Sequence, residues 1–315
     1  MIVTLTANPS LDRAVLLDDA IRPGEVQTAR GSREDAGGKG INVTRVVAAA
    51  AEATLAVLPL DEEDPFAAAL RAAHVPAVPV ALHGAARANL TITDGDGTTT
   101  KINLPGVART EADADALVDA VVASTASASW LVLAGSLPPG LPDDFYVRVI
   151  AAVRAAHEPA PLIAVDTSGA ALRAVVESAH PDLIKPNDEE LAELADVSLD
   201  PDRDLADAVH TVARTLVPSR VGAAFVTLGA HGAVLVTSDG AWRGTPPPTR
   251  VQSTVGAGDS SLAGFLLARV RGESPAECLR SGIRYGSAAA ALPGTQAPTP
   301  ADLLPGDVPV QPLAP

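Results

Sequence analysis

Short runs of apolar residues alternate with longer, alanine-rich amphipathic segments along most of the chain. The runs have the length of buried strands, and the segments repeat apolar positions at helical spacing. This alternation predicts an α/β fold in which helices cover both faces of a mainly parallel sheet. The predicted strands are Ile2–Leu5, Trp130–Ala134, Leu162–Val165, Leu183–Ile184 and Ala224–Leu228. The predicted helices are Ile41–Ala53, Pro65–Ala73, Glu111–Ala123, Asp143–Ala156, Asp188–Leu194 and Leu205–Leu216.

Two regions, 13–35 and 86–107, interrupt this rhythm with alternating polar positions. The second contains two Asp-Gly pairs, which favour hairpin turns. We expect both regions to form a small β element off the main sheet, such as a lid. Residues 233–245 predict one more hairpin. The proline-rich tail from Pro293 is expected to lie extended against the surface or to fray.

The composition narrows the class of protein. The chain has 315 residues, 47% of them hydrophobic, and no repeat or low-complexity linker divides it, so we expect residues 1–315 to form a single domain. The net charge of −15 argues against nucleic-acid or anionic-membrane partners. The N-terminus lacks a signal-peptide pattern and no apolar run reaches transmembrane length, so a cytoplasmic protein is expected.

Several common motifs are missing from the sequence. The one cysteine, Cys278, excludes an internal disulfide and a cysteine cluster for zinc, and the histidines show no metal-ligand spacing. The P-loop pattern and the dinucleotide-binding glycine pattern are both absent. A dinucleotide-dependent dehydrogenase is therefore disfavoured.

Polar residues follow the predicted strands where each strand ends. Asp12 follows the first strand, Ser136 the second, Asp166 the third and Lys185 the fourth, and Gly229 follows the fifth. Ligands of parallel α/β sheets bind beyond the carboxyl ends of the strands. Each residue alone could be an ordinary turn residue or helix cap, but together they predict one site.

Two glycine-rich segments stand at predicted helix starts. AGGKGINVTR (36–45) has three glycines, which indicates a backbone that a ligand approaches closely. TVGAGDSSLAGF (254–265) runs into Asp259. An open helix N-terminus suits a phosphate, yet aspartate is also a common cap. Asp259 is therefore either a cap or a group that acts beside a bound phosphate.

The basic residues offer a further signal. Only three of the 23 basic residues are lysines, namely Lys39, Lys101 and Lys185. Lys101 lies in the predicted lid with Arg87 and Asn89, where solvated strand residues are as good an interpretation as binding residues. Lys185 opens KPNDEE, which fits either an ordinary helix start with acidic first-turn residues or a phosphate-facing loop.

The order of these segments resembles the PfkB (ribokinase-like) carbohydrate kinases over essentially the whole chain. TVGAGDSSLAGF is similar to the C-terminal motif of that family, AGGKGINVTR to its N-terminal glycine motif, and KPNDEEL carries its NxxE pattern. TANPSLD, RANLTI, INLPG and AGSLPPGLPDDFY are similar to the hexose-phosphate branch. That branch includes 1-phosphofructokinase, tagatose-6-phosphate kinase and the minor 6-phosphofructokinase.

The resemblance implies a three-layer α/β/α fold with a β lid, ATP and Mg²⁺ as cofactors, and a homodimer formed through the lid. It implies that Asp259 is the catalytic base, for which an ordinary pKa suffices, beside an anion hole made by the amides of Gly256, Ala257 and Gly258. The substrate-binding residues that it implies are Asp12, Gly38, Lys39, Asn42, Arg87, Asn89, Lys101 and Ser136. The implied ATP-binding residues are Lys185, Asn187, Thr227 and Gly229, and Glu190 with Asp166 would position Mg²⁺ through water.

We therefore expect an ATP-dependent kinase that phosphorylates a hydroxyl of a ketohexose phosphate, in the first place D-fructose 1-phosphate, to give fructose 1,6-bisphosphate. Tagatose 6-phosphate, fructose 6-phosphate and an unphosphorylated sugar or nucleoside are alternative acceptors. A sugar-phosphate sensor on the same fold is the alternative from another class. The intact Asp259 and the pair Asn187 and Glu190 speak against a sensor.

Overall fold

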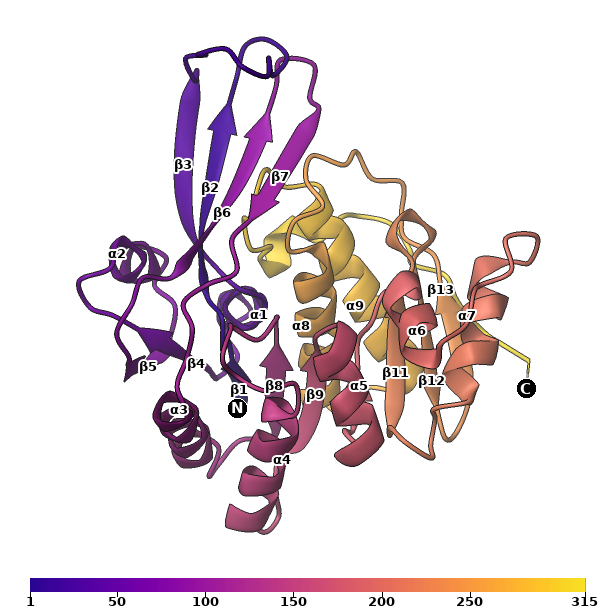
Figure 1. Cartoon of the computed structure of the whole chain (residues 1–315). Coiled ribbons are helices and arrows are strands. Elements are labelled where there is room, and N and C mark those ends of the chain that lie inside the picture. The colour runs from indigo at the N-terminus through magenta and orange to yellow at the C-terminus, as the bar shows by residue number, and fades with distance from the viewer. Residues whose placement is uncertain (315) are drawn as a thin grey trace.

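The computed structural model describes residues 1–314. A ten-stranded sheet forms its centre, in the order β14-β13-β12-β11-β10-β9-β8-β1-β4-β5 (Figure 1). Every neighbouring pair from β5 to β11 is parallel, and β12, β13 and β14 continue the sheet antiparallel. These strands are β1 (Ile2–Leu5), β4 (Thr54–Leu60), β5 (Ala77–Ala81), β8 (Trp130–Ala134), β9 (Leu162–Asp166), β10 (Leu183–Ile184), β11 (Ala223–Thr227), β12 (Ala233–Thr237), β13 (Ala241–Gly244) and β14 (Val310–Pro312).

Helices cover both faces of this sheet. Their bounds are α1 (Lys39–Ala49), α2 (Pro65–Ala72), α3 (Glu111–Ser124), α4 (Phe145–Ala156), α5 (Gly169–Ser178), α6 (Asp188–Ala195), α7 (Leu205–Arg214), α8 (Ala257–Val270) and α9 (Pro275–Ala290). The buried side chains of α3 to α7 pack in one core cluster, and those of α1, α2, α8 and α9 pack in clusters on the other face. The predicted three-layer α/β/α architecture is confirmed.

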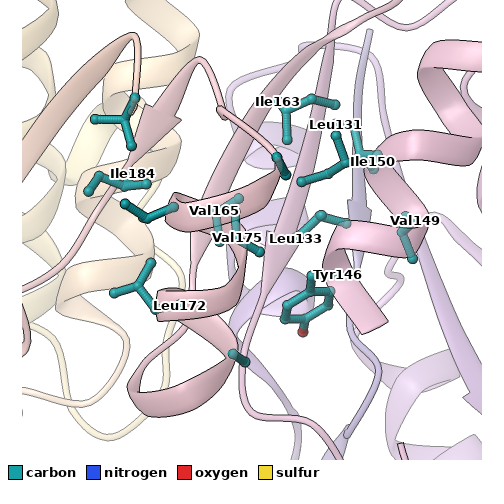
Figure 2. Close-up of a cluster of buried hydrophobic side chains, with 14 of the residues drawn as sticks. Leu131, Leu133, Tyr146, Val149, Ile150, Ile163, Val165, Leu172, Val175 and Ile184 are labelled. Carbon is teal, nitrogen blue, oxygen red and sulfur yellow. The ribbon is translucent and has the colours of Figure 1, made fainter. Parts of the chain in front are cut away.

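The strands alternate between the two cores residue by residue. Leu131 and Leu133 of β8 point toward α4 and α5 (Figure 2), whereas Val132 joins the core that contains α8 and α9. Both faces of a central parallel strand are buried, which explains why β8 reads as a continuous apolar run.

A separate four-stranded sheet stands off one end of the large sheet (Figure 1). Its order is β3-β2-β6-β7, formed by β3 (Gly31–Gly37), β2 (Ser10–Leu16), β6 (Arg87–Thr93) and β7 (Thr99–Asn103). The expectation of a β element off the main sheet, with a hairpin at the Asp-Gly pairs, is thus confirmed. We call these four strands the small sheet.

The strands and helices predicted from the sequence are present in the structure. The five predicted strands, the six predicted helices and the hairpin at 233–245 are present within a few residues of their expected bounds. The tail was expected to be extended or frayed, and its extended end forms β14, which pairs with β13. The sequence reading did not place β4, β5, α5 or α9. Within residues 1–314, no helix combines the length and apolarity needed to span a membrane.

Candidate active site

The polar residues predicted to share a site do meet beyond the carboxyl ends of the parallel strands. A cavity of about 850 Å³ opens there, within the size range of small-molecule sites. Ten of the predicted residues line it: Lys39, Lys185, Asn187, Glu190, Thr227, Gly229, Gly256, Ala257, Gly258 and Asp259. They come from α1, β10, α6, β11 and α8, so segments far apart in sequence contribute to one wall.

The start of α8 leaves backbone donors open toward the cavity. Gly256 precedes the helix in the left-handed region, with φ of 75°, and no side chain caps this end. Among residues 1–314, neither the Gly256 amide nor the Gly258 amide donates a hydrogen bond, and the Ala257 amide has only a long one of 3.4 Å to Thr254 O. Open amides and the helix dipole favour an anion at this position.

The Asp259 side chain is almost fully buried and does not cap α8. Its Oδ2 instead accepts a hydrogen bond of 2.8 Å from Nδ2 of Asn42 on α1. Oδ1 of Asn42 is buried and has no partner in residues 1–314. Of the two interpretations of this aspartate, the geometry favours a group with a chemical role over a helix cap.

Asp166 lies between two lysines at the end of β9. Lys39 Nζ donates a hydrogen bond of 2.7 Å to its Oδ1, and Lys185 Nζ forms an ion pair of 3.2 Å with its Oδ2. The Asp166 side chain is 0% exposed, that of Lys185 is 5% exposed and that of Lys39 is 36% exposed. Burial alone would raise the pKa of Asp166, but the charges of Lys185 and Lys39 hold it below its usual value.

Burial, and after it the nearby charge of Asp166, raise the pKa of Asp259 to about 6. Lys39, the Asn42 hydrogen bond and Lys185 act in the opposite direction and do not cancel the burial effect. The pKa of Asp259 therefore lies above the ordinary carboxylate value, which would already suffice for a base. A carboxylate with this pKa is still mostly ionised at pH 7 to 8 and is better matched to accepting a proton there.

Asn187 and Glu190 form a reciprocal cap at the start of α6. Asn187 Oδ1 accepts from the Glu190 amide at 2.7 Å, and Glu190 Oε2 accepts from the Asn187 amide at 2.9 Å. Asn187 is also bridged to Thr227 at the end of β11. The helix-start interpretation of KPNDEE is thus correct, and the same residues also line the cavity.

The small sheet carries the remaining predicted polar residues on one face. Asp12 lies opposite Asn89, whose Nδ2 donates to Asp12 Oδ1 at 2.9 Å, and Ser10 donates to the same oxygen at 2.7 Å. Burial raises the pKa of Asp12, although Ser10, Asn89 and Arg87 oppose the rise. Arg87 is in register with Ser10, two pairs before Asp12 and Asn89 and on the same face.

Of the eight predicted substrate residues, only Lys39 lines this cavity, and four of the others have surroundings of their own. Arg87 reaches toward Leu104 O, and Ser136 accepts a 3.4 Å hydrogen bond from Asn8 Nδ2. Lys101 is exposed on β7, opposite Thr91. Gly38 has φ of 126° directly before α1, a conformation that favours glycine.

Two sets of residues at the site were missed in the sequence. The first is Asn8. Its Nδ2 also donates to Pro105 O at 3.1 Å, so Asn8 joins the segment before β2 to the segment after β7. The second is a mainly apolar part of the cavity lining: Ala233, Pro246, Pro247, Pro248, Val251, Ile283, Gly286, Ser287 and Ala290. The triple proline was a usable signal for a fixed extended loop, but α9 gave none.

Among the described residues, no group of three or more His, Cys, Asp or Glu side chains is arranged to hold a metal ion. Glu190 faces the cavity with Asp188 and Glu189 beside it, so oxygen donors suited to a hard cation are present on that wall.

Comparison with known proteins gives the family. Residues 6–302 match the model of the pfkB family carbohydrate kinases, and the chain belongs to that family. It is 34% identical to 1-phosphofructokinase of Rhodobacter capsulatus, over 95% of this chain and 93% of the relative. It is 32% identical to ATP-dependent 6-phosphofructokinase isozyme 2 of Escherichia coli, over 94% of each chain.

The fold agrees with this assignment. The crystal structure of phosphofructokinase-2 from Escherichia coli in complex with potassium superposes with a TM-score of 0.87, at 32% identity over 96% of each chain. The predicted membership of the family and the ribokinase-like fold are confirmed, and the chain is a sugar kinase by family.

The buried charge of Asp259 predicts that Asp259→Asn stabilises the protein at pH 8. The folded-state pKa is raised from 3.8 to about 6, so folding is penalised while the carboxylate is charged. That penalty fades as pH falls from 6 toward 4, because the folded protein then takes up the proton before the unfolded chain does. The difference in Tm between the variant and the wild type should therefore be positive at pH 8 and shrink below pH 6.

Thermal unfolding from pH 4 to 8 measures this difference in Tm. The control variant is Asp239→Asn, which changes an exposed aspartate in the hairpin between β12 and β13. A variant that is less stable than the wild type at pH 8 would show that Asp259 is a net stabilising residue and would contradict the prediction.

Proposed function

We propose that this protein is an ATP-dependent kinase that phosphorylates a hydroxyl of D-fructose 1-phosphate, giving fructose 1,6-bisphosphate. The observation that carries the proposal is the buried Asp259 beside the open start of α8, in a cavity that also holds two lysines. The relatives named 1-phosphofructokinase, at 31–34% identity, support this acceptor.

Asp259 is the general base in this proposal. Its carboxylate accepts the proton of the sugar hydroxyl while the hydroxyl oxygen forms a bond to the γ-phosphorus, and the bond from that phosphorus to ADP breaks. Phosphoryl transfer depends mainly on positioning and charge neutralisation. The hydrogen bond from Asn42 holds the carboxylate on the side of α8 where the open amides lie.

The amides of Gly256, Ala257 and Gly258 form the anion hole for the transferring group. They are fixed by the helix and need no rearrangement when charge develops, which is the property that makes such donors effective. The chemistry then explains why the Asp259 carboxylate lies next to the transferring phosphate: the attacking hydroxyl oxygen has to lie between the two groups.

The acceptor is bound by residues of α1 and the small sheet. Unpaired polar atoms support this: Asn42 Oδ1, Asn89 Oδ1 and Arg87 Nε are buried without partners in residues 1–314, as expected of groups that await a ligand. We assign Asp12, Gly38, Asn42 and Asn89 to the sugar hydroxyls. We assign Lys39, Arg87, Ser136 and the more distant Lys101 to its phosphate.

The nucleotide occupies the other end of the cavity. Lys185, Asn187, Thr227 and Gly229 are assigned to ATP, and its base fits the mainly apolar part of the lining between the triple proline and α9. Mg²⁺ neutralises phosphate charge in such reactions. The family resemblance implies Glu190 and Asp166 as its water-mediated partners. Of the two only Glu190 lines the cavity, and we assign the metal to Glu190.

The chain forms one kinase domain in this proposal, with 13–35 and 86–107 as its lid and a homodimer built through the lid. The apolar side chains on the face of the small sheet opposite Asp12 support the proposal that a second copy of the chain binds there. It carries Val15, Leu90, Ile92 and Ile102, and Ile102 is 48% exposed.

The proposal predicts ADP release when MgATP is mixed with fructose 1-phosphate, in preference to fructose 6-phosphate, tagatose 6-phosphate, fructose, ribose and adenosine. Asp259→Asn should lower kcat by roughly 10²- to 10⁴-fold with little change in KM, because it removes the base and keeps the shape. A coupled ADP assay measures both.

Preference for fructose 6-phosphate, which the relative from Escherichia coli would suggest, keeps the chemistry and changes the acceptor. Turnover of a free sugar only would overturn the phosphate-binding assignments. No turnover with any acceptor, together with thermal stabilisation by sugar phosphates, would replace the kinase with a sensor.

Arg87→Ala tests the acceptor phosphate site. We expect KM for the sugar phosphate to rise about tenfold or more while KM for ATP stays within about twofold, because a charge-assisted contact contributes roughly 1.5–3 kcal/mol. Arg71→Ala is the matched control, since Arg71 is an exposed arginine on α2 that pairs with Glu62 and should leave KM unchanged. Equal effects of the two substitutions would contradict the assignment.

A further inference from the structure

We propose that Asp166 is a positioning residue that holds Lys39 and Lys185 in place for the two substrates, and that it is not a ligand of the metal. This inference rests on the proposed kinase function. It replaces the water-mediated metal role that the family resemblance implied for this residue.

Both carboxylate oxygens of Asp166 face lysines, Oδ1 in a hydrogen bond and Oδ2 in an ion pair that lacks hydrogen-bond geometry. Oδ1 is 2.7 Å from Lys39 Nζ, and Oδ2 is 3.2 Å from Lys185 Nζ. The side chain is fully buried and, unlike both lysines, is absent from the lining of the cavity. A water-mediated metal ligand needs an oxygen that water can reach, and neither oxygen of Asp166 meets that condition.

The backbone fixes the carboxylate in this position. Asp166 is the last residue of β9, paired with Ala134 of β8, and its carbonyl accepts from the Gly135 amide at 2.9 Å. The Lys185 amide in turn donates to Val165 O at 2.9 Å. Asp166 and Lys185 therefore stand on adjacent parallel strands inside the sheet ladder, where neither backbone can shift alone.

The two lysines approach from opposite sides of the reaction. Lys39 is the first residue of α1, the helix that also carries Asn42, and is partly exposed to the cavity. Lys185 lies beside the first turn of α8, where a Cβ on Gly258 would be 3.4 Å from its Nζ. One carboxylate thus connects the acceptor side with the nucleotide side.

The charges of the three side chains explain why a carboxylate lies between the two lysines. Two ammonium groups held close together repel each other, and the carboxylate between them offsets that repulsion in a site shielded from water. Fixed cations can then meet phosphate groups without reorganising, which is the arrangement that favours catalysis. Lys39 is the more exposed of the two and is free to contact an incoming phosphate while Asp166 retains it.

A double-mutant cycle tests the inference. Asp166→Asn, Lys39→Met and the double variant are compared with the wild type for kcat/KM and for the Mg²⁺ concentration that gives half-maximal rate. If Asp166 acts through Lys39, Asp166→Asn lowers kcat/KM by roughly 10- to 100-fold, the size of loss seen for other supporting residues. The same substitution then costs about threefold or less in the Lys39→Met background, and the Mg²⁺ requirement stays within about twofold.

A metal role for Asp166 predicts the reverse. The losses would multiply in the double variant, and the Mg²⁺ requirement of Asp166→Asn would rise about tenfold or more. Asp239→Asn, on an exposed hairpin, is the control for loss of an acidic side chain without a partner lysine. Asp166→Glu should recover part of the rate if its carboxylate still reaches the lysines.

Asp166→Asn leaves Lys185 buried without its partner and can destabilise the protein. The cycle is therefore repeated with Lys185→Met, where the double variant carries neither buried charge. Binding of the Mg²⁺ complex of AMP-PNP, measured by calorimetry, supplies a readout without turnover and should show the same non-additivity. Inactivity of the wild type with every acceptor would refute the proposed function, whereas additive losses in an active enzyme would refute only the role of Asp166.

Discussion

The site depends on a balance among four charged side chains, of which the fold buries three and leaves Lys39 partly exposed. Lys39 and Lys185 hold Asp166, and Asp259 lies within reach of the same lysines. The two positive and two negative charges offset one another, which makes their burial tolerable. The balance is uneven, because Asp166 has its pKa lowered while Asp259 has its pKa raised to about 6. One carboxylate is thereby kept charged as a fixed support, and the other is adjusted toward proton transfer.

The architecture supplies this arrangement through simple geometry. Parallel strands end at the same edge of the sheet, so β9 and β10 deliver Asp166 and Lys185 side by side. Helices α1 and α8 then start at that edge, and each begins after a glycine with positive φ. The small sheet adds a polar face around Asp12 that no strand of the large sheet could provide.

Much of this could be predicted from the sequence, for physical reasons. Apolar runs such as β8 fixed the sheet because both faces of a central strand are buried. The sequence did not reveal β5, an edge strand that is only partly buried, unlike the central strands. It did not reveal α9 either, whose small residues fit closely against α8: a Cβ on Gly286 would strike Ser261 Oγ. Site residues were found because they sit at strand ends and helix starts. The contacts between these residues were not predicted, because the hydrogen bond of Lys39 with Asp166 joins residues 127 positions apart.

Direct titration of Asp259 tests the central claim that this carboxylate is tuned by burial. The protein, labelled with ¹³C at aspartate carboxyl groups, is followed by NMR from pH 3 to 8, with Asp259→Asn to assign the signal. The account predicts one carboxyl group that titrates near pH 6 and is missing from the variant. If every assigned carboxyl, including that of Asp259, titrated near or below the ordinary aspartate value of about 4, Asp259 would not be a tuned base and the account of the site would be wrong.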